Sequence, residues 1–225
     1  MQLAIDTSTD SASLALAQAG EILAELTWHC GQNHTTTLLA YLANLLSQTG
    51  LGTSSIEAIF VARGPGSFNG LRVGISTAKG LAYSLGIPIV GISTLAVAAY
   101  QHAETGLPVC PIFKAGRGEI ATAIYQMKRG SWQQIIGEHI TTIEALCAQI
   151  ATKTIFCGDL TTTTSDQLKE HLKQKAIVAS PVARLRRAGF LVELGQERLA
   201  TGDFDDPATL SPIYLRRPHI TRPKR

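Results

Sequence analysis

The pattern of apolar and polar positions over the first 92 residues predicts alternating strands and helices. Short apolar segments have the length and composition of strands, and Gly20 separates two of them in a way that favours an antiparallel meander. Apolar residues at helical spacing predict two helices, the first with Asn33 as N-cap, and a third helix from Ser93. The expected strands are 3–6, 13–17, 21–28, 56–62 and 88–92, and the first two helices are 33–47 and 69–85. This order predicts an α/β fold with helices packed on a mixed sheet.

The segment 106–108, Gly-Leu-Pro, is the expected boundary between two subdomains. Beyond it we expect a second, less regular sheet, then helices, and from Gly202 an extended, docked segment with several aspartates and prolines. The expected strands lie near Ile112, at 120–125 and at 135–140, and the helices at 142–151, 165–173 and 181–199. The predicted division is an N-terminal subdomain over 1–105, a smaller one over 106–205 and an extended basic tail over 206–225. No internal repeat is visible in the sequence.

The composition favours a cytoplasmic protein without a membrane partner. The chain has 225 residues and is 45% apolar, which is enough for one large domain or two small ones with hydrophobic cores. We see no signal-peptide pattern and no apolar run of the roughly 20 residues that a membrane span needs. Its four cysteines are far apart without CxxC spacing, so we expect reduced thiols.

The formal net charge of +3 comes from the C-terminus. Five of the 20 basic residues lie in 216–225, where no acidic residue occurs, which leaves 15 basic against 17 acidic residues elsewhere. A basic tail either binds a nucleic-acid backbone by counterion release or is a solvated end without a partner. The sequence leaves both interpretations open.

A glycine-rich elbow, residues 63–74, lies between an expected strand and an expected helix; its sequence is Arg-Gly-Pro-Gly-Ser-Phe-Asn-Gly-Leu-Arg-Val-Gly. Such an elbow directs backbone N–H groups and the positive end of the helix dipole outward. It is therefore either a cradle for phosphate or a rigid platform for a protein partner. The lysine and serine of a P-loop are absent, and Lys79 lies well inside the helix, which favours the platform.

A polar turn follows the first expected strand, at residues 6–9. In phosphotransferases of the actin-like fold, an aspartate and hydroxyls at such a turn handle metal and phosphate. The same residue types also commonly bond the backbone of their own turn. The candidates for a vestigial nucleotide site are Asp6, Thr7, Ser8, Gly64 and Gly66.

No other catalytic or metal-binding motif is present. The six histidines form no HExxH or HxxxH pair, and His34 has the position of a polar residue at a helix start. No GxSxG segment occurs, which disfavours an α/β-hydrolase. We therefore expect neither a bound metal nor a catalytic residue.

Three segments together resemble the TsaB (YeaZ) family of bacterial tRNA threonylcarbamoyladenosine biosynthesis proteins. The first is Ile-Asp-Thr-Ser-Thr at 5–9, with His34 leading a leucine-rich helix, and the second is the glycine-rich elbow. The third is Pro-Ile-Tyr-Leu-Arg at 212–216, which is similar to the Pro-x-Tyr-Leu-Arg segment of the family. The resemblance is strong over 1–100, weaker through the middle and strong again at the end.

This resemblance implies an actin-like, sugar-kinase-type (ribonuclease H-like) fold of two α/β subdomains with mixed sheets. It also implies a non-catalytic subunit that pairs with TsaD, the metal-bearing transferase that modifies ANN-decoding tRNAs, and acts with the ATPase TsaE. We expect a homodimer through the same surface when the chain is alone, and contact with tRNA only through the complex. The implied partner surface is the pair of N-terminal helices, with His34, Leu38, Tyr41, Leu42, Leu45, Gly70, Arg72, Val73 and Thr77.

The chain differs from the catalytic paralogue where chemistry is expected. Thr94 and Ala98 stand where TsaD has its HxxxH metal pair, and neither replaces an imidazole. Lys114 and Leu160 depart from the TsaB pattern of an acidic residue and a glycine, which weakens a nucleotide site between the subdomains. We expect no cofactor, or weak binding of ATP or ADP. The alternatives are an ATPase or phosphotransferase that uses Asp6, and a metal-dependent glycoprotease-like protein, which the missing histidines disfavour.

Overall fold

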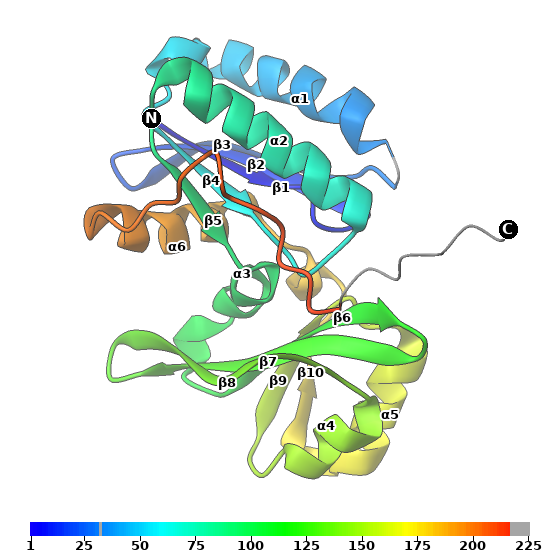
Figure 1. Ribbon diagram of the computed structural model, residues 1–225. Helices are drawn as coiled ribbons and strands as arrows, with labels where there is room; N and C mark the ends of the chain where they lie inside the picture. Colours follow the sequence, from blue (N-terminus) through cyan, green and yellow to red (C-terminus); the bar gives the residue numbers. More distant parts are fainter. Residues whose placement is uncertain (32, 217–225) are drawn as a thin grey trace, which may run out of the picture.

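The computed structural model describes residues 1–31 and 33–216, which form two lobes built on two five-stranded sheets (Figure 1). The strands of the first sheet are β1 (Gln2–Asp6), β2 (Ser11–Gln18), β3 (Glu21–His29), β4 (Ala58–Ala62) and β5 (Ile89–Ile92). Those of the second are β6 (Val109–Gly116), β7 (Glu119–Lys128), β8 (Ser131–Thr141), β9 (Thr154–Gly158) and β10 (Ala176–Val178). Both are mixed sheets, as the sequence predicted.

The two sheets repeat one topology. The first has the order β3-β2-β1-β4-β5 and the second the order β8-β7-β6-β9-β10. In each, the first three strands of the lobe are antiparallel neighbours, and the last two pair in parallel beside the first strand. The repeat was not visible in the sequence because it is conserved in strand order rather than in residues.

The helices cover both faces of each sheet, and two of them cross between the lobes. They are α1 (His34–Thr49), α2 (Phe68–Leu85), α3 (Thr94–Tyr100), α4 (Ile143–Gln149), α5 (Thr162–Leu172) and α6 (Ala188–Ala200). α1 and α2 lie side by side on the outer face of the first sheet (Figure 1). The helix α3 follows the first sheet in the chain but packs on the second, whereas α6 follows the second sheet and packs on the first.

This exchange of helices bears on the predicted division of the chain. The division into 1–105 and 106–205 follows the order of the sequence, whereas α3 packs on the second sheet and α6 on the first. Leu191 and Val192 of α6 pack with Phe60 of β4, and Leu95 of α3 packs with Phe113 of β6. The first lobe therefore includes α6, which follows the second sheet in the chain, and the second lobe includes α3, which follows the first sheet.

The alternation of side chains along β1 explains the layering of the first lobe. Leu3 and Ile5 face α1 and α2, while Ala4 belongs to the layer that meets α6. Small residues let α6 approach closely, because a Cβ added at Gly195 would lie 2.3 Å from the ring of Phe60. The wide leucine-rich layer thus lies under α1 and α2, and the thin alanine-rich layer under α6.

An extended C-terminal strap, residues 203–216, is docked on the protein as predicted, and it contacts both lobes. Asp205 bridges to Ile89 of β5, and Lys79 of α2 donates to two strap carbonyls at 3.2 Å. The Ile213 N–H donates to the Arg63 carbonyl (2.6 Å), and Arg216 pairs with Glu119 of β7. The remaining part of the predicted basic tail, 217–225, lies outside the described residues.

Some element boundaries differ from the prediction. The expected helix over 181–199 begins only at Ala188, because a short 3-10 turn (Val182–Arg184) and an extended residue precede it. Asn33 occupies the N-cap position of α1, but its side chain makes no capping bond, whereas Ser67 caps α2. Strands β9 and β10 were not predicted, since they are short and carry no alternation. Within the described residues, no helix combines the length and the hydropathy of a membrane span.

Candidate functional site

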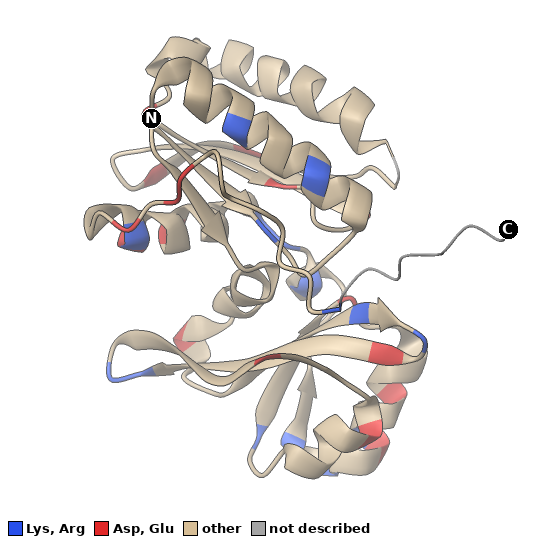
Figure 2. Ribbon diagram, in the orientation of Figure 1, with Lys and Arg blue, Asp and Glu red and all other residues tan. Residues whose placement is uncertain are grey.

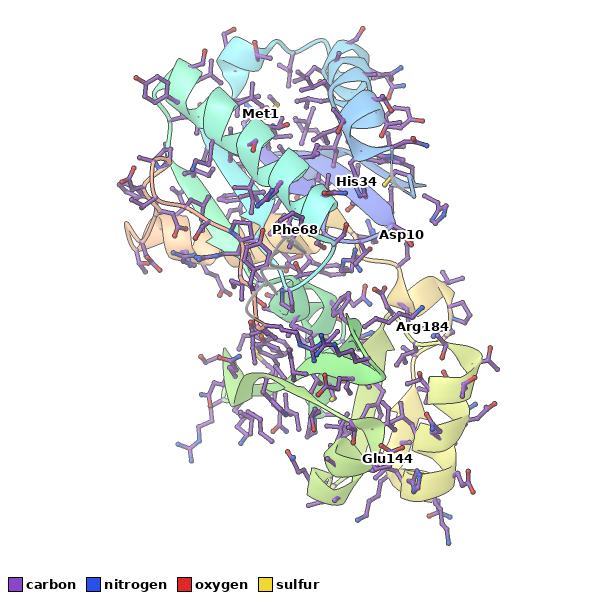
Figure 3. The ribbon with its side chains drawn as sticks, turned by 45° about the vertical axis from the view of Figure 1, so that its right-hand side comes forward. Met1, Asp10, His34, Phe68, Glu144 and Arg184 are labelled. Carbon is purple, nitrogen blue, oxygen red and sulfur yellow. The ribbon has the colours of Figure 1, made fainter. Side chains whose placement is uncertain are left out.

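The turn between β1 and β2 fixes the N-termini of α1 and α2 to one another. The Ser67 N–H donates to the Ser8 carbonyl (2.6 Å), and the Thr7 hydroxyl donates to the Gly70 carbonyl (2.7 Å). His34, the first residue of α1, lies 2.8 Å from the Thr9 carbonyl through Nε2, which donates because a carbonyl only accepts. His34 and Phe68 accordingly lie at the same end of the first lobe, near Asp10 (Figure 3).

Glycines of the elbow provide close contact with this turn. A Cβ added at Gly66 would lie 2.1 Å from the Ser8 carbonyl oxygen, and one at Gly70 would lie 2.1 Å from that of Thr7. A Cβ at Gly74 would lie 2.2 Å from the Thr7 hydroxyl. The protein's own backbone therefore occupies the space beside these glycines that a phosphate cradle would keep open.

Asp6, at the end of β1, is almost fully buried and all of its contacts are within the chain. Its Oδ1 accepts from the N–H (2.9 Å) and hydroxyl (2.6 Å) of Ser8. Its Oδ2 accepts from Nε of Arg186 at 3.0 Å, an ion pair in which both side chains are less than 5% exposed. Sequence reasoning missed Arg186, since nothing in the loop before α6 relates it to a residue 180 positions away.

A cavity of about 430 Å³ lies between the lobes beside this ion pair. Its charged lining comes from Asp10 of the first lobe and from Lys114 and Asp159 of the second. Burial raises the pKa of Asp159 above its ordinary value, and the nearby Arg186 guanidinium opposes that increase. Asp10 and Arg184 lie on opposite sides of the region between the lobes in Figure 3. Two carboxylates and the Lys114 ammonium line the cavity. At its Gly66 and Ser67 edge, the Ser67 N–H is already bonded to the Ser8 carbonyl.

The structure separates the predicted partner-surface residues into two groups. His34, Leu38, Leu42, Leu45 and Gly70 are buried in the first lobe, where the three leucines pack on the sheet. Tyr41 and Arg72 are exposed, and Val73 and Thr77 are half-buried. The buried group can shape a partner surface but cannot contact a partner directly.

Two exposed features at this surface were not predicted. Leu39 on α1 and Tyr83 on α2 are 58% and 86% exposed, the largest apolar exposures of the two helices. At the start of α2, Arg72 lies over the Phe68 ring at 3.7 Å, and Tyr214 of the strap lies 5.7 Å from the same ring. The helical periodicity identified the leucine-rich faces of these helices, but it did not indicate which apolar residues remain outside the core.

The residues that stand at the paralogue's metal pair have structural roles. Thr94 is fully buried, and its hydroxyl accepts from the Gly64 N–H at 3.1 Å, which holds the elbow to α3. Ala98 packs in the core of the second lobe, and its carbonyl accepts from Cys157. Among residues 1–31 and 33–216, no group of three or more metal-ligating side chains is present.

The two departures from the family pattern also have visible consequences. Leu160 packs in the core of the second lobe beside Phe156, so the position of the lost glycine is filled by an apolar side chain. Lys114 is exposed and lines the interlobe cavity. Cys30, Cys110, Cys147 and Cys157 are free thiols in the structure.

Solved structures confirm the expected fold. A crystal structure from Pseudomonas aeruginosa, described as similar to the peptidase YeaZ, aligns with a TM-score of 0.81 and 28% identity over 96% of this chain and 99% of that one. A second structure, named YeaZ from the same organism, aligns with a TM-score of 0.77 and 26% identity over 94% of this chain and 99% of that one. The chain therefore has the actin-like fold of two mixed-sheet lobes.

Sequence comparisons identify the family. The family model described as TsaD, tRNA N6-adenosine threonylcarbamoyltransferase, matches residues 24–222. The Bacillus subtilis protein named tRNA threonylcarbamoyladenosine biosynthesis protein TsaB is 30% identical over 95% of this chain and 93% of its own length. The chain belongs to the TsaB (YeaZ) family.

Proposed function

We propose that this chain is a non-catalytic, activating scaffold subunit in the synthesis of threonylcarbamoyladenosine in ANN-decoding tRNAs. Its curated relatives carry the name of that pathway, and a transferase family model covers most of the chain. In this proposal a TsaD-type subunit performs the transfer and a TsaE-type ATPase acts through the complex. The chain contacts tRNA only indirectly and works in the cytoplasm.

One observation carries the proposed pairing, namely the lack of charge on an exposed helix pair. α1 contains no Asp, Glu, Lys or Arg in 16 residues, and α2 contains only Arg72 and Lys79 in 18 (Figure 2). A helix on the outside of a monomeric protein usually has a charged outer face, whereas the centre of an interface is depleted of charge and enriched in aromatic residues. The outer face carries Leu39 and Tyr83, no acidic side chain and one exposed arginine, Arg72, and it thus fits a partner better than it fits water.

We define the partner face as seven accessible residues of this helix pair. They are Leu39, Tyr41, Arg72, Val73, Thr77, Gly80 and Tyr83. Gly80 has nothing within 4 Å of an added Cβ, so its lack of a side chain leaves room for a partner rather than for this chain's own core. In the absence of a TsaD-type subunit, the same face forms a symmetric homodimer, which competes with the heterodimer.

The proposed lack of catalysis is supported by the two positions that correspond to the metal pair. Thr94 and Ala98 supply no imidazole, and the Thr94 hydroxyl is committed to the elbow. The name of the Pseudomonas relative refers to a peptidase, but the histidine hydrogen bonds among the described residues go to backbone carbonyls and to Gln101, not to a serine or a cysteine. The proposed role also needs no cofactor of this chain's own.

Reconstitution tests this function. The TsaD-type and TsaE-type subunits of the same organism are incubated with substrate tRNA, ATP and the threonylcarbamoyl donor, with and without this chain. The modified nucleoside is then measured by mass spectrometry. We expect the modified nucleoside to form only when this chain is present. We expect the rate per folded molecule of this chain to be the same for Asp6→Asn as for the unmodified chain. Formation at an equal rate without the chain would contradict the proposal.

A further inference from the structure

Arg186 makes contacts with both lobes from the loop between the Val182–Arg184 turn and α6. In the first lobe, its Nε donates to Asp6 and its Nη2 to the Thr9 hydroxyl and the Ser11 carbonyl (3.3 Å). In the second lobe, Nη1 lies 3.8 Å from the Asp159 carboxylate, and the guanidinium carbon lies 5.2 Å from the centre of the Phe113 ring. The side chain is 4% exposed, so this is a buried cation shared between the lobes.

The surroundings of Asp6 do not fit a metal–nucleotide group. A metal ion or a phosphate-bound cation at this turn needs free carboxylate and hydroxyl oxygens. Both Asp6 oxygens already accept hydrogen bonds, from Ser8 and from Arg186, and the Thr7 hydroxyl is directed to the Gly70 carbonyl. A guanidinium stays protonated at every physiological pH, so proton loss never releases the carboxylate.

We infer that Arg186 is a built-in cation that replaces a metal–phosphate group at the Asp6 turn and holds the two lobes together. The position beside the aspartate of this turn is occupied here by a residue of the chain itself, and the cavity of about 430 Å³ between the lobes lies next to it. The closure of the lobes therefore depends on an internal ion pair and not on a nucleotide. This inference concerns the isolated chain and stands apart from the proposed pairing with a transferase.

Other contacts also cross between the lobes. Tyr100 of α3, the helix that packs on the second sheet, meets the ring of Phe190 of α6, the helix that packs on the first, with ring centres 6.4 Å apart. The hydroxyl of Ser93, which caps α3, donates to Glu138 of β8. Together with the strap, these contacts hold the lobes at their edges, whereas Arg186 holds them at the centre.

Hydrogen exchange on the isolated full chain tests the inference, with Arg186→Met as the variant. Removal of the cation leaves the buried Asp6 carboxylate without a counter-charge and removes the tie to Asp159. We expect amide exchange to become about tenfold faster at residues 7–10 and 159–161, one turn in each lobe. The matched control is Arg187→Met, because the adjacent Arg187 is exposed and its ion pair is with Glu25 of the first lobe. Equal exchange in the two variants at both turns would overturn the inference.

A second variant covers the case in which Arg186→Met does not fold. Asp6→Asn combined with Arg186→Met removes both charges and leaves no unpaired carboxylate at the turn. We expect this double variant to fold and still to exchange faster at 159–161, where Asp159 has lost its cation. Exchange at 159–161 as slow as in the unmodified chain would contradict the role of Arg186 as a tie between the lobes.

Calorimetry with ATP and magnesium tests the replacement itself. We expect the unmodified chain to show no magnesium-dependent binding at millimolar ATP. Magnesium-dependent binding that Asp6→Asn abolishes would overturn the inference. Because the measurement uses neither tRNA nor a transferase, its failure is distinguishable from a failure of the proposed function.

Discussion

At the scale of single residues, the structure changes the role of the polar turn after β1. The sequence singled out Asp6, Thr7 and Ser8 as candidates for a vestigial nucleotide site, because an aspartate and hydroxyls follow a buried strand. It could not show that their partners are Arg186 and the carbonyl of Gly70, which lie far away in the chain. A motif identifies residues that can form hydrogen bonds, and only the tertiary contacts show which hydrogen bonds they form.

The buried cysteines give a first prediction at this scale. Burial raises the pKa of Cys110 from 9.0 to about 12, and it also raises the pKa of Cys157. Since the thiolate is the reactive form, a shift of that size lowers its fraction at neutral pH about a thousandfold. In the folded protein at pH 8, we expect iodoacetamide to label the half-buried Cys147 first and Cys110 and Cys157 only in denaturant, as measured by peptide mass spectrometry. Early labelling of Cys110 would contradict this burial.

The carboxylate of Asp159 gives a second prediction. Burial raises its pKa, so the native state holds this proton more tightly than the unfolded chain does. Its contribution to stability therefore decreases as pH rises from its ordinary value of 3.8 through the raised pKa of the folded state. Carbon-detected NMR titration should show this raised pKa, and Arg186→Met should raise it further because the opposing cation is gone. A pKa at or below the ordinary value would contradict the assignment.

At the scale of elements, the helix pair shows what periodicity predicts and what it leaves open. The spacing correctly predicted two helices at 33–47 and 69–85, and Ser67 and glycines mark the start and end of α2. The leucine-rich stripe was expected at the partner surface, but it packs on the sheet because it is the widest apolar face. A single sequence shows that a helix has an apolar face, whereas the absence of charge on the opposite face is the better sign of a partner.

A pair of leucines on α1 tests this assignment of faces. Leu42 is 3% exposed and packs in the first core, whereas Leu39 is 58% exposed. We expect Leu42→Ala to lower the free energy of unfolding by about 2–5 kcal/mol, and Leu39→Ala to change it by about 0.5 kcal/mol or less. Urea unfolding of the isolated chain measures both. Similar losses for the two variants would show that the faces of α1 are assigned incorrectly.

At the scale of the whole molecule, the exchange of α3 and α6 makes the two lobes depend on each other. The sequence predicted the first sheet and three strands of the second, since short apolar segments and turns are local features, and the family resemblance implied that both sheets are mixed. It did not predict the exchange, because the destination of a helix depends on contacts such as those of Gly195 with Phe60 and of Leu95 with Phe113. The result is a body in which strap, exchanged helices and Arg186 all hold one arrangement of the lobes, as suits a scaffold.

The central claim is that the partner face binds a TsaD-type subunit, and the affinity for that subunit tests it most directly. Tyr83→Glu and Gly80→Glu place a charge on exposed positions of α2, and Thr163→Glu places the same charge on exposed α5 in the second lobe as a control. Calorimetric titration gives the Kd of each variant for the TsaD-type subunit. Size-exclusion chromatography with light scattering checks that the fraction of homodimer is unchanged. We predict a loss of about tenfold to hundredfold, or about 1.4–2.8 kcal/mol, for both α2 variants and an unchanged Kd for the control. An unchanged Kd for the two α2 variants would contradict the account.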